Sequence, residues 1–290
     1  MAQGKEPVLI NLDETAVSRS PHEAVGLVVS QRWWQDGESR PGQPINRQKL
    51  RGMVTHVGLC CPRSDVQGRL PQIFIGNYRC FTTALVDAMS PRLPRNVQFW
   101  RRRSSWNSSD LMEDILREIS DVMTTHFPNC QPIIVMDSAP IHLSRAVVRR
   151  AAALGLWLLI VPARCTYALQ PLDTHVFSPY KAFLARAYRD AKNGEGVVTD
   201  EAWGDMLVAV VRFMNGRRWQ HAFAQDGLLG DRRQQQLSRE LRHLPSSNSA
   251  PSTRMPSILS LRLLWPTNRF LPYASLMSGP LGRRLRLFVN

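Results

Sequence analysis

The sequence predicts an α/β protein built on one mixed sheet that is flanked by helices. Three short apolar runs, at residues 7–13, 133–136 and 156–161, have the composition of strands that are buried on both faces. Two β-prone runs separated by turn residues lie between the first and the second of these and predict an antiparallel hairpin. Helical periodicity follows in separate segments, so the sheet should combine an antiparallel part with parallel strands.

The first predicted strand covers residues 7–13, which are mainly valine, leucine and isoleucine and end at Asp13 and Glu14. Residues 18–50 then contain glycines, prolines and a pair of tryptophans without a helical or a strand period. We interpret residues 18–50 as an irregular insertion.

The hairpin consists of residues 53–60 and residues 70–75. These two runs are joined by a segment that contains Pro62, Asp65 and Gly68. All three are turn-forming residue types, so the two strands should pair antiparallel.

Helices alternate with strands in the middle of the chain. Apolar side chains between residues 111 and 123 recur on one helical face, and a second helix is expected over residues 146–154, closed by Gly155. This second helix lies between the apolar runs 133–136 and 156–161, so the two strands should be parallel with a right-handed crossover. The residues available as the N-cap of the first helix are Ser108, Ser109 and Asp110.

Two further helices complete the predicted domain, one beginning at Ser178 and Pro179 and one over residues 203–214. The resulting order is strand, insertion, hairpin, helix, strand, helix, strand, helix, which is the order of an RNase H-like fold. We assign residues 1–231 to this domain. Residues 232–290 form a tail rich in serine, proline and arginine, which we expect to be disordered.

The net charge of +14 favours a polyanionic partner, because lysine and arginine neutralise phosphates. Residues 231–290 contain ten arginines against Asp231 and Glu240, so +8 of this charge lies there. The remaining +6 is an ordinary excess that is compatible with DNA binding without being diagnostic of it.

Five cysteines without a CxxC pair, and without a histidine at zinc-ligand spacing, argue against a structural zinc site. No uncharged apolar run approaches the roughly 20 residues of a membrane span, and the N-terminus has no signal-peptide pattern. We therefore expect a soluble protein without a membrane partner, in a reducing compartment.

Two carboxylates are placed for metal chemistry. Asp13 and Asp137 each follow an apolar strand, where open α/β sheets position their sites. Magnesium prefers hard oxygen ligands and is commonly held by one or two carboxylates and substrate phosphates. A third acid would complete a site for two ions about 4 Å apart, which together activate a nucleophile and stabilise the leaving oxygen.

Three motifs resemble those of pogo-like transposases and the relatives of centromere protein B. Residues 166–173 read TYALQPLD and resemble the T-x-x-LQPLD motif of that family. Residues 11–15, NLDET, resemble its N-x-DET motif, and Asp137 with His142 resembles its D-N-x-x-x-H pattern. Asp137 and Asp173 are separated by 35 residues, a spacing like that of the mariner and pogo groups. The resemblance covers roughly residues 7–231.

The resemblance implies a DDE superfamily endonuclease and strand transferase in which Asp13, Asp137 and Asp173 bind two Mg²⁺ ions, or Mn²⁺. It implies DNA as the partner, a nuclear location and an upstream or separate helix-turn-helix module that recognises the DNA sequence, and it is compatible with a homodimer. The chain departs from the family at Ser138, where asparagine is usual. The alternative is a domesticated or decayed transposase that acts only as a DNA-binding or protein-interaction module. A phosphatase of the aspartyl-phosphate kind is disfavoured because Thr15 stands where a second aspartate is needed.

Other residues are candidates for supporting roles. Glu14 is the main alternative to Asp13 as a metal ligand. Because neighbouring side chains on a strand point to opposite faces, we expect Glu14 instead to pair with a basic group or to face solvent. His142 could orient a carboxylate or a phosphate, with a helix cap or a surface position as the alternative. We expect Glu14, His142 and Gln170 to support the carboxylates. The basic side chains that could contact DNA, or else be plain surface, are Arg101, Arg102 and Arg103 in a loop beside two tryptophans, and Lys181 about two helical turns after Asp173.

Overall fold

The computed structural model describes residues 4–18, 53–162, 165–195 and 198–229, together with two short strands at 262–264 and 270–271. Apart from Ser18, the predicted insertion lies outside the described residues, and so does most of the predicted tail. The domain boundary at residue 231 therefore stays a prediction. The two short strands lie within the tail, for which no structure was predicted from the sequence.

One sheet of eight strands forms the centre of the molecule, in the order β4-β3-β2-β1-β5-β6-β7-β8. The central strand β1 pairs antiparallel with β2 on one side and parallel with β5 on the other. The pairs β2–β3, β6–β7 and β7–β8 are antiparallel, and β3–β4 and β5–β6 are parallel. The strands are β1 Glu6–Ser18, β2 Met53–Cys60, β3 Gln72–Asn77, β4 Val97–Arg102, β5 Cys130–Met136, β6 Trp157–Ile160, β7 Arg262–Leu264 and β8 Phe270–Leu271.

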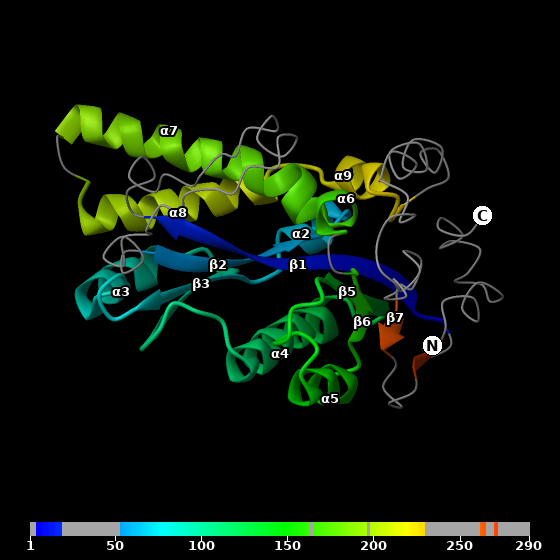
Figure 1. The fold of residues 1–290 in the computed structure, drawn as a ribbon. Coiled ribbons are helices and arrows are strands. Elements are labelled where there is room, and N and C mark those ends of the chain that lie inside the picture. The colour runs from blue at the N-terminus through cyan, green and yellow to red at the C-terminus, as the bar shows by residue number, and fades with distance from the viewer. Residues whose placement is uncertain are drawn as a thin grey trace, which may run out of the picture.

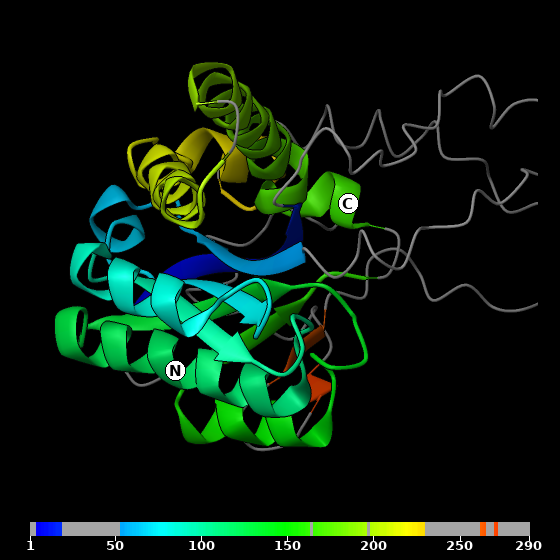
Figure 2. The ribbon, with the colours of Figure 1, turned by 90° about the vertical axis from the view of Figure 1, so that its left-hand side faces the viewer.

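Helices cover both faces of the sheet, with α4 and α5 below it and α7 and α8 above it in Figures 1 and 2. The antiparallel β1–β2–β3 meander joined to parallel β5 and β6 confirms the predicted RNase H-like mixed sheet. The helices are α2 Ser64–Gln67, α3 Thr83–Met89, α4 Ser109–His126, α5 Arg145–Ala153, α6 Thr166–Leu169, α7 Phe177–Glu195, α8 Asp200–Asn215 and α9 Gln220–Gln225, with a 3₁₀ turn η2 at Ser90–Arg92 and a π-helical turn η3 at Leu172–Val176.

Strand alternation in β1 divides the core into two clusters, one on each face of the sheet. Val8, Ile10 and Leu12 pack in the cluster that contains the buried side chains of α4 and α5. Leu9 and Val17 pack in the other cluster, which contains those of α7 and α8. Odd-numbered residues of β1 therefore face η3 and α7, and even-numbered residues face α4 and α5.

Most of the predicted elements are confirmed. The hairpin is present as β2 and β3, with the short helix α2 between the two strands. Helix α4 begins after Ser108, whose side chain accepts a hydrogen bond from the Leu111 amide, as its N-cap role predicts. The β5–α5–β6 unit is parallel as expected, and α8 covers the helix predicted at residues 203–214.

Three details of the prediction are wrong. Strand β1 does not end at Asp13 but continues to Ser18, because β2 remains paired with it over that length. Helix α7 begins at Phe177 and follows directly from η3, so Ser178 lies within the helix and is not its N-cap, while Pro179 lies in the first turn as predicted. Proline fits at this position because the preceding π-helical turn already departs from regular α-helical hydrogen bonding.

The third detail concerns the arginine run. Arg101 and Arg102 are not in a loop but in β4, which is the edge strand of the sheet. Strand β4 pairs in parallel with β3, and α3 and η2 form the connection between them. None of these three elements was predicted. Among the described helices, none combines the length and the apolar character that crossing a membrane requires.

Candidate active site

Three chain segments meet beside the middle of β1. The parallel pairing of β1 with β5 ends at the pair Asn11 and Val135, while β1 itself continues along β2. Asp13 and Asp137 each lie two residues beyond that last pair, where the two strands separate. The turn η3, which carries Asp173, packs against β1 and β2 at this level. The two aspartates on strands and the one on η3 are therefore brought together by the fold.

The side chain of Asn11 joins all three segments. It is fully buried; its Nδ2 donates a hydrogen bond of 3.0 Å to the Val135 carbonyl oxygen, and its Oδ1 accepts one of 2.8 Å from the Leu172 amide. Val135 lies two residues before Asp137, and Leu172 lies one residue before Asp173. One amide side chain thus fixes the backbones that carry the three carboxylates. The sequence showed Asn11 only as part of a motif, without this role.

Gly58 allows η3 and α7 to approach the sheet. It pairs with Asp13 across β1 and β2. A Cβ atom at Gly58 would lie 3.3 Å from Cε1 of Phe177 and 3.6 Å from Cδ2 of Leu172, which is tight packing on the ring side. A larger residue would push η3, and Asp173 with it, away from β1.

The carboxyl groups of Asp13 and Asp173 lie close enough for each to affect the pKa of the other. Asp13 is only 9% exposed, and this burial is the main cause of its raised pKa. Repulsion from the negative charges of Asp173 and Glu14 raises the pKa further. Burial also raises the pKa of Asp173, while the nearby Lys181 and the Thr166 hydroxyl act in the opposite direction. Burial of Asp13 and the negative charges of Asp173 and Glu14 beside it therefore favour the protonated form of the Asp13 carboxyl group.

Asp137 is held in a different way. Its Oδ1 accepts hydrogen bonds from His142 Nδ1, at 2.6 Å, and from the Ala139 amide, at 2.9 Å. The hydrogen bond from His142 lowers the pKa of Asp137. The Asp137 charge also contributes to the raised pKa values of Asp13 and Asp173, which places the three carboxyl groups in electrostatic contact.

His142 lies between two carboxylates. It is 1% exposed, and its Nε2 is 3.2 Å from Glu14 Oε1 while Nδ1 faces Asp137. Burial lowers the pKa of His142, but the hydrogen bonds to Asp137 and Glu14 outweigh it and raise the pKa to about 10. Both ring nitrogens can donate only in the protonated ring, so His142 is an imidazolium that bridges the two acids.

Glu14 points to the face of β1 opposite Asp13, as strand alternation requires. In addition to His142, it accepts a hydrogen bond of 2.5 Å from Asn107 Nδ2, in the segment that precedes α4. Glu14 is thus the partner of a basic group. Gln170 is fully buried, but its amide has no hydrogen-bond partner among the described residues and does not bond to the carboxylates.

A second buried acid supports η3 from the far side. Asp226 follows α9 and is 4% exposed. It accepts hydrogen bonds from Thr174 Oγ1, at 2.6 Å, and from His175 Nε2, at 3.0 Å. Both donors follow Asp173 directly in the chain, so Asp226 ties the turn that carries Asp173 to the end of α9. No sequence pattern predicts this contact, because it joins residues about 50 positions apart.

The donor chemistry of this site suits a hard divalent cation, because the carboxylate oxygens of Asp13, Asp137 and Asp173 act electrostatically on one another there. In the described ranges, however, no three histidine, cysteine, aspartate or glutamate side chains are close enough to hold one ion between them. Asp13 and Asp173 are in contact, and Asp137 Oδ1 is occupied by His142 and Ala139. Asp13 and Asp173 could therefore both bind one cation in their present positions. Asp137 would be the third ligand through its Oδ2 atom, because its Oδ1 atom already accepts two hydrogen bonds.

The predicted basic contacts occupy two places. Lys181 lies on α7, exposed, and close enough to lower the pKa of Asp173. Arg101 stacks its guanidinium 4.4 Å from the Tyr78 ring and donates to the Phe81 carbonyl, and Arg102 lies 5.6 Å from the Trp100 ring. Within the described residues, none of these cations is in a salt bridge.

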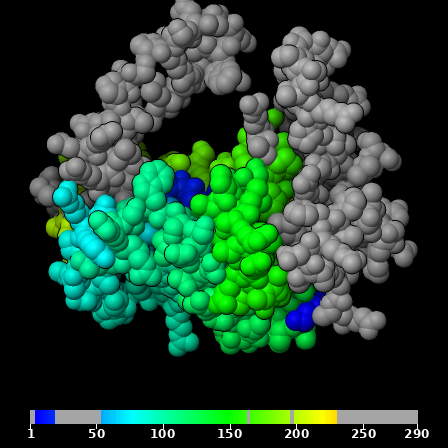
Figure 3. Space-filling view, turned by 60° about the horizontal axis from the view of Figure 1, so that its bottom comes forward, coloured from blue at the N-terminus to red at the C-terminus, as the bar shows by residue number. Residues whose placement is uncertain are grey.

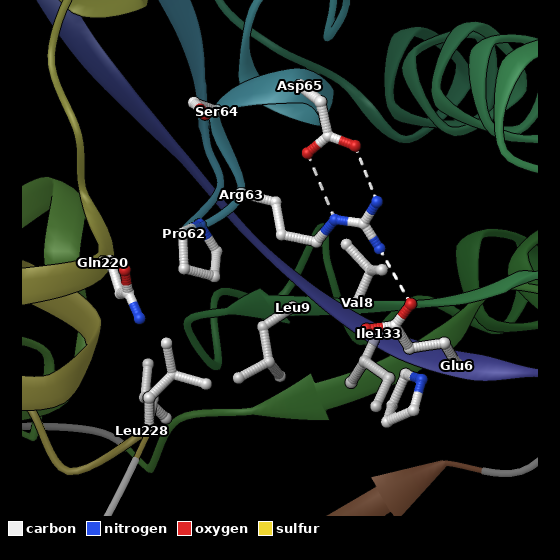
Figure 4. Close-up of a pocket in the computed structure, with 12 residues that line it drawn as sticks. Glu6, Val8, Leu9, Pro62, Arg63, Ser64, Asp65, Ile133, Gln220 and Leu228 are labelled. Carbon is white, nitrogen blue, oxygen red and sulfur yellow. Dashed lines mark hydrogen bonds and ion pairs between the residues drawn. The ribbon is translucent and has the colours of Figure 1, made fainter.

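A pocket of about 460 Å³ lies elsewhere, at the N-terminal end of β1 (Figure 4). Its floor is apolar, with Leu9 and Leu228 among the lining residues, and its rim carries Arg63. The Arg63 guanidinium is already paired with Asp65, at 2.6 Å, and with Glu6, at 3.0 Å. None of the site carboxylates lines this pocket, so it is separate from the candidate active site.

Comparison with known proteins identifies the family. Residues 54–206 match the family model described as DDE superfamily endonuclease, a range that includes Asp137 and Asp173 and begins after Asp13. No curated protein matches. Among solved structures, a Mos1 transposase paired-end complex with the left transposon end is 14% identical with a TM-score of 0.36, and the chain covers 55% of it with 76% of its own length. The catalytic domain of Mos1 mariner transposase is 13% identical with a TM-score of 0.35, over 75% of this chain and 81% of that chain.

The chain thus spans about half the length of the Mos1 transposase chain in that complex. Similarity this distant carries no argument about activity or partners. The family model is the stronger finding because it matches more than half of the chain. The chain belongs to the DDE superfamily endonucleases.

Proposed function

We propose that this chain is the catalytic domain of a metal-dependent DNA endonuclease and strand transferase of the transposase type. Asp13, Asp137 and Asp173 would hold two Mg²⁺ ions, or Mn²⁺. The observation that carries the proposal is the close approach of the buried Asp13 carboxyl group to that of the exposed Asp173, with the Asp137 carboxylate acting electrostatically on both.

A buried carboxylate with a second acid close by is costly to ionise unless a cation compensates the charge. Mg²⁺ is bound in proteins by one or two carboxylates together with waters and substrate phosphates. These carboxylates therefore suit a site that binds a divalent cation together with a phosphate of the substrate.

Each residue then has a defined task. Bound ions would supply an activated water or 3′-hydroxyl and stabilise the leaving oxygen. Asn11 holds the three backbones in register, and protonated His142 keeps Asp137 ionised and oriented while Glu14 balances the histidine charge. Lys181, next to Asp173 and exposed, would contact a phosphate of the same strand.

DNA is the proposed partner, with the exposed Arg101, Arg102 and Arg103 as backbone contacts at the edge of the sheet. Their contribution is independent of sequence. Sequence recognition would come from a separate or upstream helix-turn-helix module, and the action on DNA implies a nuclear location. A homodimer would bring two such sites to the two ends of one DNA segment.

The direct test is a nicking assay on DNA with Mg²⁺ or Mn²⁺. Purified wild-type protein should cut a labelled duplex, and Asp137→Asn should abolish the cutting because the third carboxylate is lost. The matched control is Asp121→Asn, which changes an exposed aspartate on α4 outside the site and should leave the rate unchanged. Equal activity in wild type and Asp137→Asn would sink the proposal.

A second candidate function is a module that keeps the fold and binds DNA or protein without catalysis. It is favoured by the position of Asp137, whose Oδ1 is held by His142 and Ala139 rather than turned toward the other two acids. Thermal melting with Mn²⁺ decides between the two, because a ligand that binds only the folded state raises the melting temperature. A catalytic site gives a rise in wild type that is lost in Asp13→Asn. A module without catalysis gives no rise in either protein.

A further inference from the structure

The turn η3 carries one of the three aspartates without being part of the sheet. Asp13 and Asp137 lie on or directly after strands, whose positions are fixed by pairing with neighbouring strands. Asp173 depends instead on how a single π-helical turn, Leu172–Val176, is held against β1. Such turns depart from regular helical hydrogen bonding and are frequent at functional sites. The contacts of η3 therefore decide where the third carboxylate lies.

Hydrogen bonds hold η3 on both sides of its aspartate. On the N-terminal side, the Leu172 amide donates to Asn11 Oδ1, at 2.8 Å. On the C-terminal side, Thr174 Oγ1 and His175 Nε2 donate to Asp226, at 2.6 Å and 3.0 Å. The residues before and after the aspartate are thus tied to two different elements, β1 and the end of α9.

Asp226 reaches this turn from an element that is remote in the sequence. Both α9 and Asp226 lie beyond residues 54–206, the range that the family model matches. Burial raises the pKa of the Cys60 thiol, and the nearby Cys61 and Asp226 raise it further, which places Asp226 close to β2. Cys60 in turn pairs with Asn11 across β1 and β2. Asp226 is therefore close to the strand pair that carries the other anchor of η3.

The support comes from one side of the sheet. In Figure 1, α9 lies above the sheet with α7 and α8, and its buried side chains belong to the same core cluster as theirs. Figure 3 views the other side, where part of β1, in blue, is visible between the teal and green segments of the chain. Asp226 therefore supports η3 from the side of the sheet opposite to α4 and α5.

The contact with Asp226 is not needed to satisfy the Thr174 hydroxyl. Thr174 Oγ1 also lies 2.9 Å from the Gln170 carbonyl oxygen, which can accept its single proton. Asp226 itself is 4% exposed, and a buried carboxyl group is costly unless its oxygens find hydrogen-bond partners. Its contacts with Thr174 and His175 therefore do more to fix the acid and the turn against each other than to satisfy the turn.

We propose that Asp226 is a positioning residue: by fixing the two residues that follow Asp173, it holds that carboxylate beside Asp13. It contacts neither a cation nor the substrate. Ligands bind a metal ion well only if they are held close to the productive geometry beforehand, and residues that orient metal ligands contribute about 10–100-fold to metal affinity. The consequence for metal binding rests on the proposed function, whereas the consequence for the position of η3 does not.

Two substitutions of Asp226 separate hydrogen bonding from packing. Asp226→Leu keeps a branched side chain but accepts no hydrogen bond. Asp226→Asn offers its oxygen to His175 and its NH₂ group to the Thr174 oxygen, which then donates to the Gln170 carbonyl. The asparagine variant should therefore keep the support of η3, and the leucine variant should lose it.

The first measurement follows η3 in the full chain without metal. In hydrogen–deuterium exchange, the amides of residues 170–177 should exchange about tenfold faster in Asp226→Leu, because two hydrogen bonds no longer oppose local opening of the turn. Asp226→Asn should exchange like the wild type. The amides of α4, on the other side of the sheet, should be unchanged in all three proteins.

The second measurement is the affinity for Mn²⁺ by isothermal titration calorimetry. Asp226→Leu should bind Mn²⁺ at least about tenfold more weakly than the wild type, and Asp226→Asn should bind it like the wild type. Gln131→Leu controls for lost stability, since Gln131 is 7% exposed in β5 and donates a hydrogen bond of 2.8 Å to the Gly155 carbonyl oxygen. It should melt at a lower temperature and bind Mn²⁺ with unchanged affinity.

The outcomes separate this inference from the proposed function. Wild-type affinity for Mn²⁺ in Asp226→Leu, or an equal loss of affinity in Gln131→Leu, overturns the positioning role while the metal site itself stands. If the wild type binds no Mn²⁺, the proposed function fails and exchange decides alone. Faster exchange confined to η3 in Asp226→Leu then supports the positioning role, and unchanged exchange overturns it. If Asp226→Leu does not fold, Thr174→Val removes one of the two contacts and takes its place in both measurements.

Discussion

Asn11 shows how much of a charged site can depend on one neutral residue. Its side chain is the only link in the described structure that reaches from β1 to both the end of β5 and the start of η3 through side-chain hydrogen bonds. Because it is fully buried, no water can replace either bond if it is removed. The geometry of the three carboxylates therefore depends on a residue that takes no part in metal chemistry.

Replacing Asn11 should cost both stability and function. Asn11→Ala leaves the Val135 carbonyl and the Leu172 amide buried without partners, and each unsatisfied group costs about 1–3 kcal/mol. We expect the free energy of unfolding in urea to fall by about 2–4 kcal/mol, with an unchanged denaturant slope. Asn193→Ala, at an exposed position of α7, is the control and should change it by less than about 0.5 kcal/mol. Equal stabilities of the two variants would contradict the bridging role.

His56 makes a second prediction, on pH. It is fully buried in β2, stacked 4.2 Å from the Phe74 ring and 5.4 Å from the Tyr180 ring, and burial lowers its pKa to about 3. The unfolded chain takes up a proton near the ordinary value of 6.5, while the folded protein does not. The unfolded state therefore binds more protons, and His56 makes the protein less stable as the pH falls from about 6.5 toward about 3.

The measurement compares the wild type with His56→Phe, which keeps the ring stack. The difference in free energy of unfolding between the two proteins should be constant above pH 7 and should move in favour of His56→Phe between pH 6 and pH 4. Other titrating groups, including the site carboxylates, cancel in this difference. A difference that does not depend on pH would show that His56 becomes charged in the folded protein.

At the scale of elements, the turn η3 and the strand β1 form the site by close approach. Gly58, on β2, provides the space for the Phe177 ring that follows η3. Asp226 holds the same turn from the other side through Thr174 and His175. The position of the Asp173 carboxylate thus depends on packing against Gly58 on one side of η3 and on the hydrogen bonds to Asp226 on the other.

A methyl group at Gly58 should disturb this approach. In Gly58→Ala the new Cβ would lie 3.3 Å from the Phe177 ring, so we expect a loss of about 1–3 kcal/mol in the free energy of unfolding and a larger relative loss of nicking. Gly194→Ala is the control, because no atom lies within 4 Å of a Cβ there and it lies within α7. That change should stabilise by about 0.5–1 kcal/mol. Denaturation curves of the two variants that shift in the same direction would contradict the proposed packing.

The edge strand β4 shows why an element can escape sequence analysis. It is six residues long and ends in arginines, which suggested an exposed loop. Charged side chains are common on edge strands because they discourage further strand pairing. The pattern that predicts buried strands therefore fails for β4, where only Val97 is buried.

At the scale of the whole molecule, the sequence predicted the central strands and the helices between them. Apolar runs and helical periodicity are local patterns, which can be recognised without knowing the tertiary contacts. It placed the end of β1 at Asp13 because polar residues usually mark a strand end, whereas here they mark the site. The burial of His142 and the bridging by Asn11 could not be predicted, since both depend on residues more than 100 positions away. The catalytic roles of the three aspartates stay a prediction.

The two faces of β1 carry different partners, which has a consequence for deletions within this strand. Asp13 points to the face of β1 that packs against η3, and Glu14 points to the opposite face, where it pairs with His142. Losing one codon anywhere between the start of β1 and Asp13 would shift the strand register by one residue and exchange the two faces. Glu14 would then point at Asp173, Asp13 at His142, and the apolar residues of each core cluster toward the wrong helices. A single in-frame deletion here would thus disturb the carboxylate contacts and the packing of both core clusters together.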